Sequence, residues 1–216
     1  MIRLYQRFLR QRFFNRILLT YTLILVATLV FLTVVILDGL DAQTRADMEL
    51  QNARLVEALR GSFMLKDREA RQILQQLYLN PVQYTGIFQL LETDRITIDD
   101  EYLRNKKLVD NFLASAVSLD MDITEALIYN KRAGTFYLAS RDILLDVDSF
   151  RETNATVLRT MDDMFYGPVI TPAYRQRYVG GITRTLFTIA LNIRGSQDSK
   201  KFNESVGVLF LNFAVS

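Results

Sequence analysis

Tyrosine and arginine side chains able to bind a small solute gather in two stretches of this sequence, residues 129–141 and 174–184. A tyrosine ring stacks on a small molecule, and a guanidinium group binds a carboxylate through two parallel hydrogen bonds. We therefore predict a ligand-binding pocket formed by Tyr129, Tyr137, Arg141, Tyr174, Arg177, Tyr178 and Arg184. The alternative is that these rings pack with their hydroxyls at the rim of a core and that the guanidinium groups are solvated.

Enzyme chemistry is not predicted for this chain. The sequence contains no histidine and no cysteine, which excludes a histidine general base, a phosphorylated histidine and disulfides. It contains no glycine-rich nucleotide loop and no Gly-x-Ser-x-Gly motif. The acidic residues at positions 94 and 99–101 suit a solvated helix start better than a metal site, because no calcium-loop motif surrounds them. We predict no catalytic residue, no metal site and no cofactor.

Two pairs of strands are predicted to carry the candidate pocket. Residues 122–141 alternate around a turn at Lys131–Gly134, a pattern typical of a β-hairpin, with Gly134 suited to positive φ. The alternation predicts one face with Ala126, Ile128, Phe136 and Leu138, and the other with Leu127, Tyr129 and Tyr137. Residues 183–194 alternate similarly. A polar turn at 195–201 follows, and the apolar run 205–216 is typical of a central strand.

Helices are predicted before and between these strands. Residues 41–80 favour a long helix with a break at Gly61-Ser62 and an end at Asn80-Pro81. This helix is either a dimeric, signal-transmitting stalk or one amphipathic helix on a domain surface. Residues 81–119 favour helices in pieces, and residues 142–182 favour short helices and then a loop folded over a surface. The predicted fold class is α+β, with an antiparallel sheet, a long N-terminal helix and flanking helices.

Residues 17–37 form an apolar segment of 21 residues without charge, proline or glycine. As a helix it spans about 30 Å, the thickness of a bilayer hydrocarbon core. Five arginines and no acids precede it, so the positive-inside rule predicts a cytoplasmic N-terminus and an extracytoplasmic chain after about residue 38. The length of the segment disfavours the alternative of a cleaved signal peptide. The predicted organisation is a basic N-terminus (1–16), a transmembrane helix (17–37), a stalk helix (38–80) and an extracytoplasmic domain (81–216).

The part of the chain after the apolar segment is slightly acidic. Of the 26 basic residues, five precede the segment, which leaves 21 basic against 24 acidic residues and a net charge near −3. This part therefore has no basic field suited to nucleic acid, and no nucleic-acid partner is predicted.

The order of these elements resembles one family of bacterial receptors. The chain has a basic start, one span, a helix ending in ILQQLYLN, a hairpin of the form ITEALIYN…TFYLASR and a closing strand GVLFLNF. This order is similar to the extracytoplasmic half of YesM-like sensor histidine kinases, which is a Cache domain with a PAS-like fold. The resemblance implies a two-component receptor that forms a homodimer and recognises a small extracellular solute, often carbohydrate-related.

In that family a second span, a HAMP linker, a histidine-bearing helix and an ATP-binding domain follow the sensor. This sequence departs from that pattern, so the resemblance implies either an N-terminal fragment of such a receptor or a truncated gene product. The leading hypothesis is therefore a sensing module, the N-terminal part of a sensor histidine kinase without its kinase core. Two alternatives remain open. One is the sensor part of a membrane-bound AraC-type transcriptional regulator. The other is an envelope scaffold protein that binds no small ligand.

Overall fold

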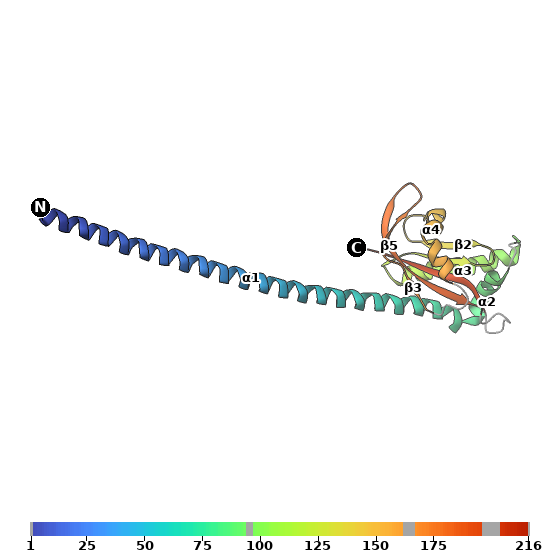
Figure 1. The fold of residues 1–216 in the computed structure, drawn as a ribbon. Coiled ribbons are helices and arrows are strands. Elements are labelled where there is room, and N and C mark those ends of the chain that lie inside the picture. The colour runs from blue at the N-terminus through green and yellow to red at the C-terminus, as the bar shows by residue number, and fades with distance from the viewer. Residues whose placement is uncertain (1, 94–96, 162–166, 196–203, 216) are drawn as a thin grey trace. The chain divides into compact units, whose positions relative to one another are not determined.

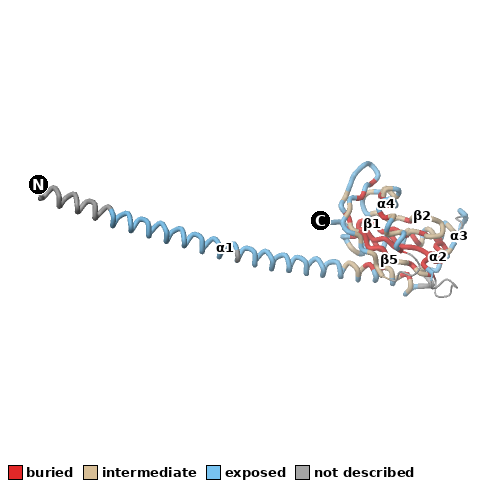
Figure 2. The backbone as a smooth tube through the Cα atoms, viewed as in Figure 1, coloured by how far each residue is buried: buried red, intermediate tan, exposed pale blue. Residues whose placement is uncertain are grey.

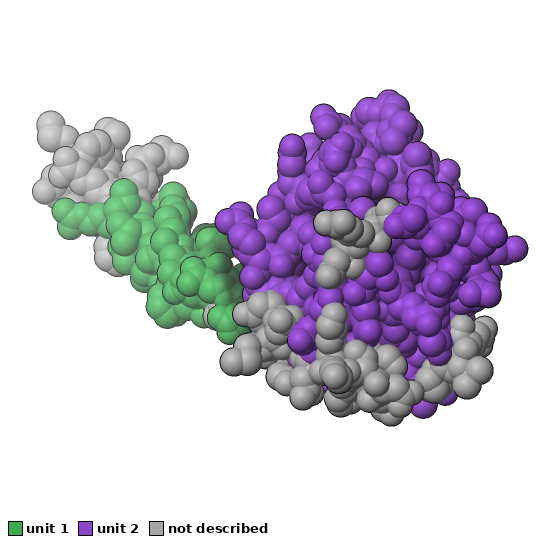
Figure 3. Space-filling model, turned by 90° about the vertical axis from the view of Figure 1, so that its right-hand side faces the viewer, with its two compact units in different colours: residues 1–62 green, residues 63–216 purple. Residues whose placement is uncertain are grey.

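The chain forms two compact units in the computed structural model, residues 1–62 and residues 63–216 (Figure 3). The structure describes residues 2–93, 97–161, 167–195 and 204–215. The predicted polar turn at 195–201 lies, apart from Gly195, outside the described residues.

The first unit is helical. Helix α1 extends from Ile2 to Leu79, so that its last residues belong to the second unit (Figure 1). Every side chain described between residues 16 and 62 is exposed, including the apolar side chains of 17–37 (Figure 2). Among the described residues, α1 is the one helix that is long and apolar enough to cross a membrane. Exposed apolar side chains over this length are suited to the hydrocarbon core of a bilayer.

The predicted break at Gly61-Ser62 is wrong, because both residues are helical within α1. A glycine in a helix interior costs only about 1 kcal/mol relative to alanine, and the flanking leucine, alanine and arginine residues are strong helix formers. The predicted end of the helix is confirmed. Helix α1 stops at Leu79, and Pro81 begins helix α2, where its missing N–H would have no partner within the helix.

Helices in the second unit follow the predicted order. Helix α2 covers Pro81–Glu92 and helix α3 covers Asp100–Leu119. Asp99 caps α3 by accepting a hydrogen bond of 2.7 Å from the Tyr102 backbone N–H, so the acids at 99–101 form a helix start as predicted. Two short helices, α4 (Val147–Thr153) and α5 (Ala155–Thr160), lie in the irregular segment 142–182.

A six-stranded antiparallel sheet forms the centre of the second unit. Its order is β2-β1-β6-β5-β3, and β4 also pairs with β5. The strands are β1 (Ile123–Asn130), β2 (Thr135–Ser140), β3 (Val169–Ile170), β4 (Tyr174–Arg177), β5 (Thr183–Arg194) and β6 (Ser205–Ala214). The α+β class and both predicted strand pairs are confirmed. The segment 167–182, predicted as a loop, instead contributes the two short strands β3 and β4.

The sheet buries both of its faces, but under different elements. On the face that we call the helix face, apolar side chains of β1, β5 and β6 pack against α2, α3 and the last turns of α1. On the opposite face, which we call the loop face, the cover comes from side chains of residues 143–161, with α4 and α5, and of residues 169–178, with the edge strand β4. We call these two stretches the covering segment. Figure 2 shows the buried backbone concentrated in this sheet and the helices that cover it.

The predicted sharing of faces in the first hairpin is wrong. Leu127 pairs with Leu138, and Tyr129 pairs with Phe136, so these four side chains share the loop face. Ile128 pairs with Tyr137 on the helix face. Residues directly opposite in an antiparallel ladder point to the same side, and the turn sets which residues are opposite. The turn itself is as predicted, with Gly134 at φ +66°.

Candidate functional site

A row of buried polar side chains crosses the loop face of the sheet. Glu125 of β1 lies opposite Asn212 of β6, which in turn lies opposite Thr188 of β5. The three residues are 1%, 0% and 0% exposed. The Thr188 hydroxyl donates to Asn212 Oδ1 at 2.7 Å, and Asn212 Nδ2 donates to Glu125 Oε2 at 3.2 Å. We call Glu125, Asn212 and Thr188 the polar row.

Two tyrosines of the covering segment bind the ends of the polar row. The Tyr178 hydroxyl donates to Glu125 Oε1 at 2.6 Å, and the Tyr174 hydroxyl lies 2.6 Å from Thr188 Oγ1. Burial raises the pKa of Tyr178, and its hydrogen bond to the Glu125 carboxylate raises that pKa further. Burial also raises the pKa of Tyr174. Both rings are therefore neutral hydrogen-bonding groups at physiological pH.

The Glu125 carboxylate is fully hydrogen-bonded in its buried position. Its Oε1 accepts from Tyr178, and its Oε2 accepts from Asn212 and from the Thr124 hydroxyl, which lies 2.7 Å away. A carboxylate removed from water is tolerated only with such partners. Removing one partner of a buried polar group costs about 1–3 kcal/mol. The polar row is thus a network in which each member depends on its neighbours.

The edge of this network carries two groups that suit a solute. The Arg184 guanidinium lies 5.6 Å from the centre of the Tyr178 ring, and its contact with Asp142 is a long one, 3.6 Å between Nη1 and Oδ2. Gln176 lies opposite Arg184 in the β4–β5 ladder and is fully buried. Among the residues that the structure describes, its Oε1 has no hydrogen-bond partner, while its Nε2 donates to the Arg177 carbonyl at 2.8 Å. A buried acceptor without a donor is an unsatisfied site for a ligand N–H or O–H.

Three of the seven predicted site residues come together here: Tyr174, Tyr178 and Arg184. Tyr129 lies on the same face but packs against Phe136, with ring centres 4.8 Å apart. Tyr137 lies on the opposite, helix face.

The remaining two predicted residues make structural contacts elsewhere. Arg141 donates to the backbone carbonyls of Val117 and Asp120 at the end of α3. Arg177 is exposed and pairs with Asp146, the N-cap of α4, at 3.1 Å. Arg141 therefore satisfies backbone carbonyls at the C-terminal end of α3, as basic side chains commonly do. Arg177 instead pairs with the carboxylate that caps the N-terminal end of α4.

The sequence interpretation missed Glu125, Asn212, Thr188 and Asn154. Asn154 donates to the Tyr174 hydroxyl at 3.3 Å and to the Phe150 carbonyl at 3.1 Å. A signal for the first three was present, because each interrupts an otherwise apolar strand segment: ITEALI, LFTIAL and VLFLNF. A polar residue inside a strand buried on both faces requires a partner, and here the partners are one another.

Two polar surface cavities lie away from the polar row. One, of about 230 Å³, is lined by residues of α2 and α3 that include Gln89, Tyr102 and Asn105. The other, of about 290 Å³, is lined by residues that include Glu69, Gln76 and Asp120. The polar row itself is closed over by the covering tyrosines, so solute access there requires the cover to move.

Comparison with solved structures finds 20 chains that match. No family model matches the chain, and no curated protein matches its sequence. The sensory domain of the Campylobacter jejuni chemoreceptor Tlp3 (CcmL), solved with isoleucine bound, is 17% identical over 74% of this chain and 53% of that chain, with a TM-score of 0.45. An extracellular domain assigned to a histidine kinase, soHK1S-Z6, is 15% identical over 72% of this chain and 61% of that chain, with a TM-score of 0.32.

A second structure of the Tlp3 ligand-binding domain, in complex with L-valine, is 16% identical, with a TM-score of 0.45. It is matched over 74% of this chain and 54% of its own length. The chain therefore spans about half the length of the chemoreceptor domains that it matches. Both Tlp3 structures are of the sensory, ligand-binding domain of that chemoreceptor.

Proposed function

We propose that this chain is the membrane-anchored, extracytoplasmic ligand-sensing module of a bacterial signal-transduction receptor. In this proposal the sheet and its covering segments are a Cache-type, PAS-like sensor domain, and the chain is the N-terminal part of a sensor histidine kinase. The observation that carries the proposal is the loop face of the sheet. There a buried polar row is held by two tyrosines of a covering segment, beside an unsatisfied glutamine oxygen and a half-buried arginine.

The chemistry of this edge favours a small polar solute. Arg184 offers a cationic group, and Gln176 Oε1 offers an acceptor. Tyr178 and Tyr174 offer hydroxyls that already exchange hydrogen bonds with the polar row. Such a set recognises hydroxyl, amine or carboxylate groups, which fits a sugar-related solute as well as an amino acid or an organic acid.

A ligand screen on the full chain in lipid nanodiscs tests this function. Sugars, sugar acids, amino acids and organic acids are added one at a time, and the unfolding temperature is recorded. We expect at least one compound to raise it, since binding to the folded state alone stabilises by mass action. Arg184→Ala should abolish that rise. Arg175→Ala, on the exposed side of β4, is the matched control and should retain it. If no compound stabilises the chain, or if both variants respond like the wild type, this function is wrong.

The proposed topology is tested through the absence of cysteine in the chain. Single cysteines are introduced as Gln6→Cys and Met121→Cys, the second at a side chain that is 86% exposed. A membrane-impermeant maleimide should label the Met121→Cys variant in intact cells and the Gln6→Cys variant only after permeabilisation. The reverse pattern would contradict an extracytoplasmic sensor domain.

A further inference from the structure

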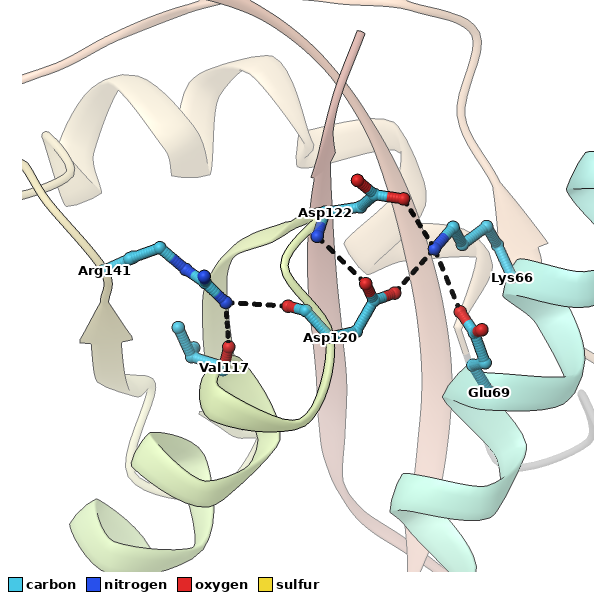
Figure 4. A network of polar contacts seen from close by, with 6 residues as sticks. All are labelled: Lys66, Glu69, Val117, Asp120, Asp122 and Arg141. Atoms are coloured by element: carbon cyan, nitrogen blue, oxygen red, sulfur yellow. Dashed lines mark hydrogen bonds and ion pairs between the residues drawn. The ribbon is translucent and has the colours of Figure 1, made fainter. Parts of the chain in front are cut away.

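An ionic cluster joins α1 to the sheet at one end of β1. Lys66 Nζ lies 2.6 Å from Asp120 Oδ2, 2.8 Å from Asp122 Oδ2 and 3.1 Å from Glu69 Oε2 (Figure 4). The Lys66 side chain is 13% exposed. It also lies 5.6 Å from the centre of the Phe213 ring on β6. We call Lys66, Glu69, Asp120 and Asp122 the Lys66 cluster.

The residues of the Lys66 cluster come from several elements of the fold. Lys66 and Glu69 belong to α1, Asp120 is the C-cap of α3, and Asp122 directly precedes β1. The Asp122 backbone N–H donates to Asp120 Oδ1 at 2.9 Å. Arg141, just after β2, donates to the Asp120 carbonyl at 2.7 Å (Figure 4). One lysine therefore holds α1 against the junction between α3 and β1.

The same end of β1 also carries one end of the polar row. Asp122 is three residues from Glu125, and the β1–β6 ladder shifts register between Ile123 and Glu125. The Thr124 hydroxyl, at this bulge, donates to Glu125 Oε2 at 2.7 Å and lies 3.2 Å from the Asn212 carbonyl oxygen, so the two acceptors share its one proton. A bulge is a point where a strand bends and where neighbouring side chains are re-aimed.

Strand β6, like the start of β1, places neighbouring residues in the polar row and beside the Lys66 cluster. Asn212 points to the loop face and bonds Glu125, while the next residue, Phe213, points to the helix face beneath Lys66. The Ala214 backbone N–H donates to the Asp122 carbonyl at 3.1 Å. The polar row and the Lys66 cluster therefore share two adjacent strand ends, on opposite faces of the sheet.

We propose that the Lys66 cluster is a latch that couples the polar row to the position of α1 on the sheet. The proposal rests on the proposed sensing function and adds its route: a solute that changes the contact between Tyr178 and Glu125 shifts the bulge at Thr124. That shift moves Asp122 relative to Lys66, and it weakens or strengthens the contact of α1 residues 63–79 with the sheet. Coupling of this kind requires an element that both sites bias, and the bulged end of β1 is that element.

Amide hydrogen exchange on the full chain in nanodiscs tests the latch without any ligand. Tyr178→Phe removes the hydroxyl that binds Glu125 and keeps the ring. We expect exchange in residues 63–79 of α1 to rise roughly threefold or more relative to α2, because coupled sites typically transmit 0.5–2 kcal/mol. Tyr129→Phe is the matched control, since it removes a tyrosine hydroxyl on the same face of the sheet, and Tyr129 packs against Phe136. It should leave that ratio unchanged.

The reverse direction is tested at the Lys66 cluster. Because coupling is reciprocal, Asp122→Asn should raise exchange in residues 174–178 relative to α2. Asp67→Asn, which alters the Asp67–Arg71 pair within α1, should not. The latch is wrong if either variant changes exchange equally throughout the second unit, or only next to its own position. A ligand found in the thermal screen would then still support the sensing function. Coupled exchange without any ligand would support the latch alone.

Discussion

The two faces of the sheet are buried by different kinds of contact. The helix face is covered by regular helices through aliphatic and aromatic side chains such as Leu113, Phe112 and Ile128. The loop face also buries an apolar cluster, which includes Phe150 and Phe210, but a polar row crosses it near the start of β1 and the end of β6. Apolar packing is nondirectional and contributes in proportion to area, whereas a buried polar network depends on every partner being in place. The helix face is thus suited to hold the sheet in place. The loop face is suited to change structure when one of the hydrogen bonds in its polar row changes.

The largest expected effect lies on the helix face. Leu113 of α3 is fully buried there, so Leu113→Ala should lower the free energy of unfolding by about 3 kcal/mol through lost transfer energy and a cavity. Chemical denaturation of the full chain in nanodiscs measures this value. Leu103→Ala, at a position of α3 that is 54% exposed, should change stability by less than about 0.5 kcal/mol. Equal losses for the two variants would contradict the assignment of this face to the core.

A smaller effect is expected in the polar row. Thr188→Val preserves shape but removes the donor to Asn212 Oδ1 and the partner of the Tyr174 hydroxyl. The cost should be about 1–3 kcal/mol, measured by the same denaturation experiment. Thr183→Val, at an exposed position of the same strand, is the matched control. An unchanged stability for Thr188→Val would show that the network does not depend on its members as described.

The smallest of the three effects concerns the Lys66 cluster. Burial alone lowers the pKa of Lys66, but its hydrogen bonds to Asp120, Asp122 and Glu69 outweigh burial and raise that pKa. Burial raises the pKa of Asp120, yet its hydrogen bond from Lys66 outweighs burial, so that this pKa lies below the usual 3.8. Lys66→Met should therefore cost about 1 kcal/mol near neutral pH, the upper end for partly exposed ion pairs.

The pH dependence of that cost follows from the direction of each shift. A carboxyl with a lowered pKa contributes stability above its unfolded value near 3.8, and the contribution is lost as the pH falls through the lower folded value. The raised pKa of Lys66 contributes below its unfolded value near 10.5, so it is constant in the acid range. The difference between wild type and Lys66→Met should be constant from about pH 5 to pH 9 and shrink below about pH 4. A difference that grows in acid would contradict this assignment.

Local sequence signals were sufficient for much of the fold. Pro81 marks a helix start, Asp99 caps α3, and Gly134 allows the hairpin turn, each through chemistry within a few residues. The apolar segment 17–37 and its arginine flank predict a span by length and charge alone. The long helix before Pro81 is confirmed, but the break expected in it at Gly61-Ser62 is absent, because one glycine costs less than its neighbours contribute.

The candidate site was only partly predictable. Tyr174, Tyr178 and Arg184, three of the predicted ligand-binding residues, do lie together, but Tyr137, which was predicted to join them, lies on the opposite face of the sheet. A shift of one residue in pairing sends a side chain to the other side of a sheet, and the pairing of β1 with β2 was read from alternation alone.

The amino-acid sequence by itself determined the apolar segment, the order of helices and strands, and the absence of histidine and cysteine chemistry. The tertiary structure alone decided which polar residues meet. Glu125 and Asn212 are 87 positions apart, and no local pattern brings them into register. Their pairing follows from β6 lying between β1 and β5, because that arrangement buries both faces of the central strand and leaves the Asn212 side chain polar partners on the two neighbouring strands.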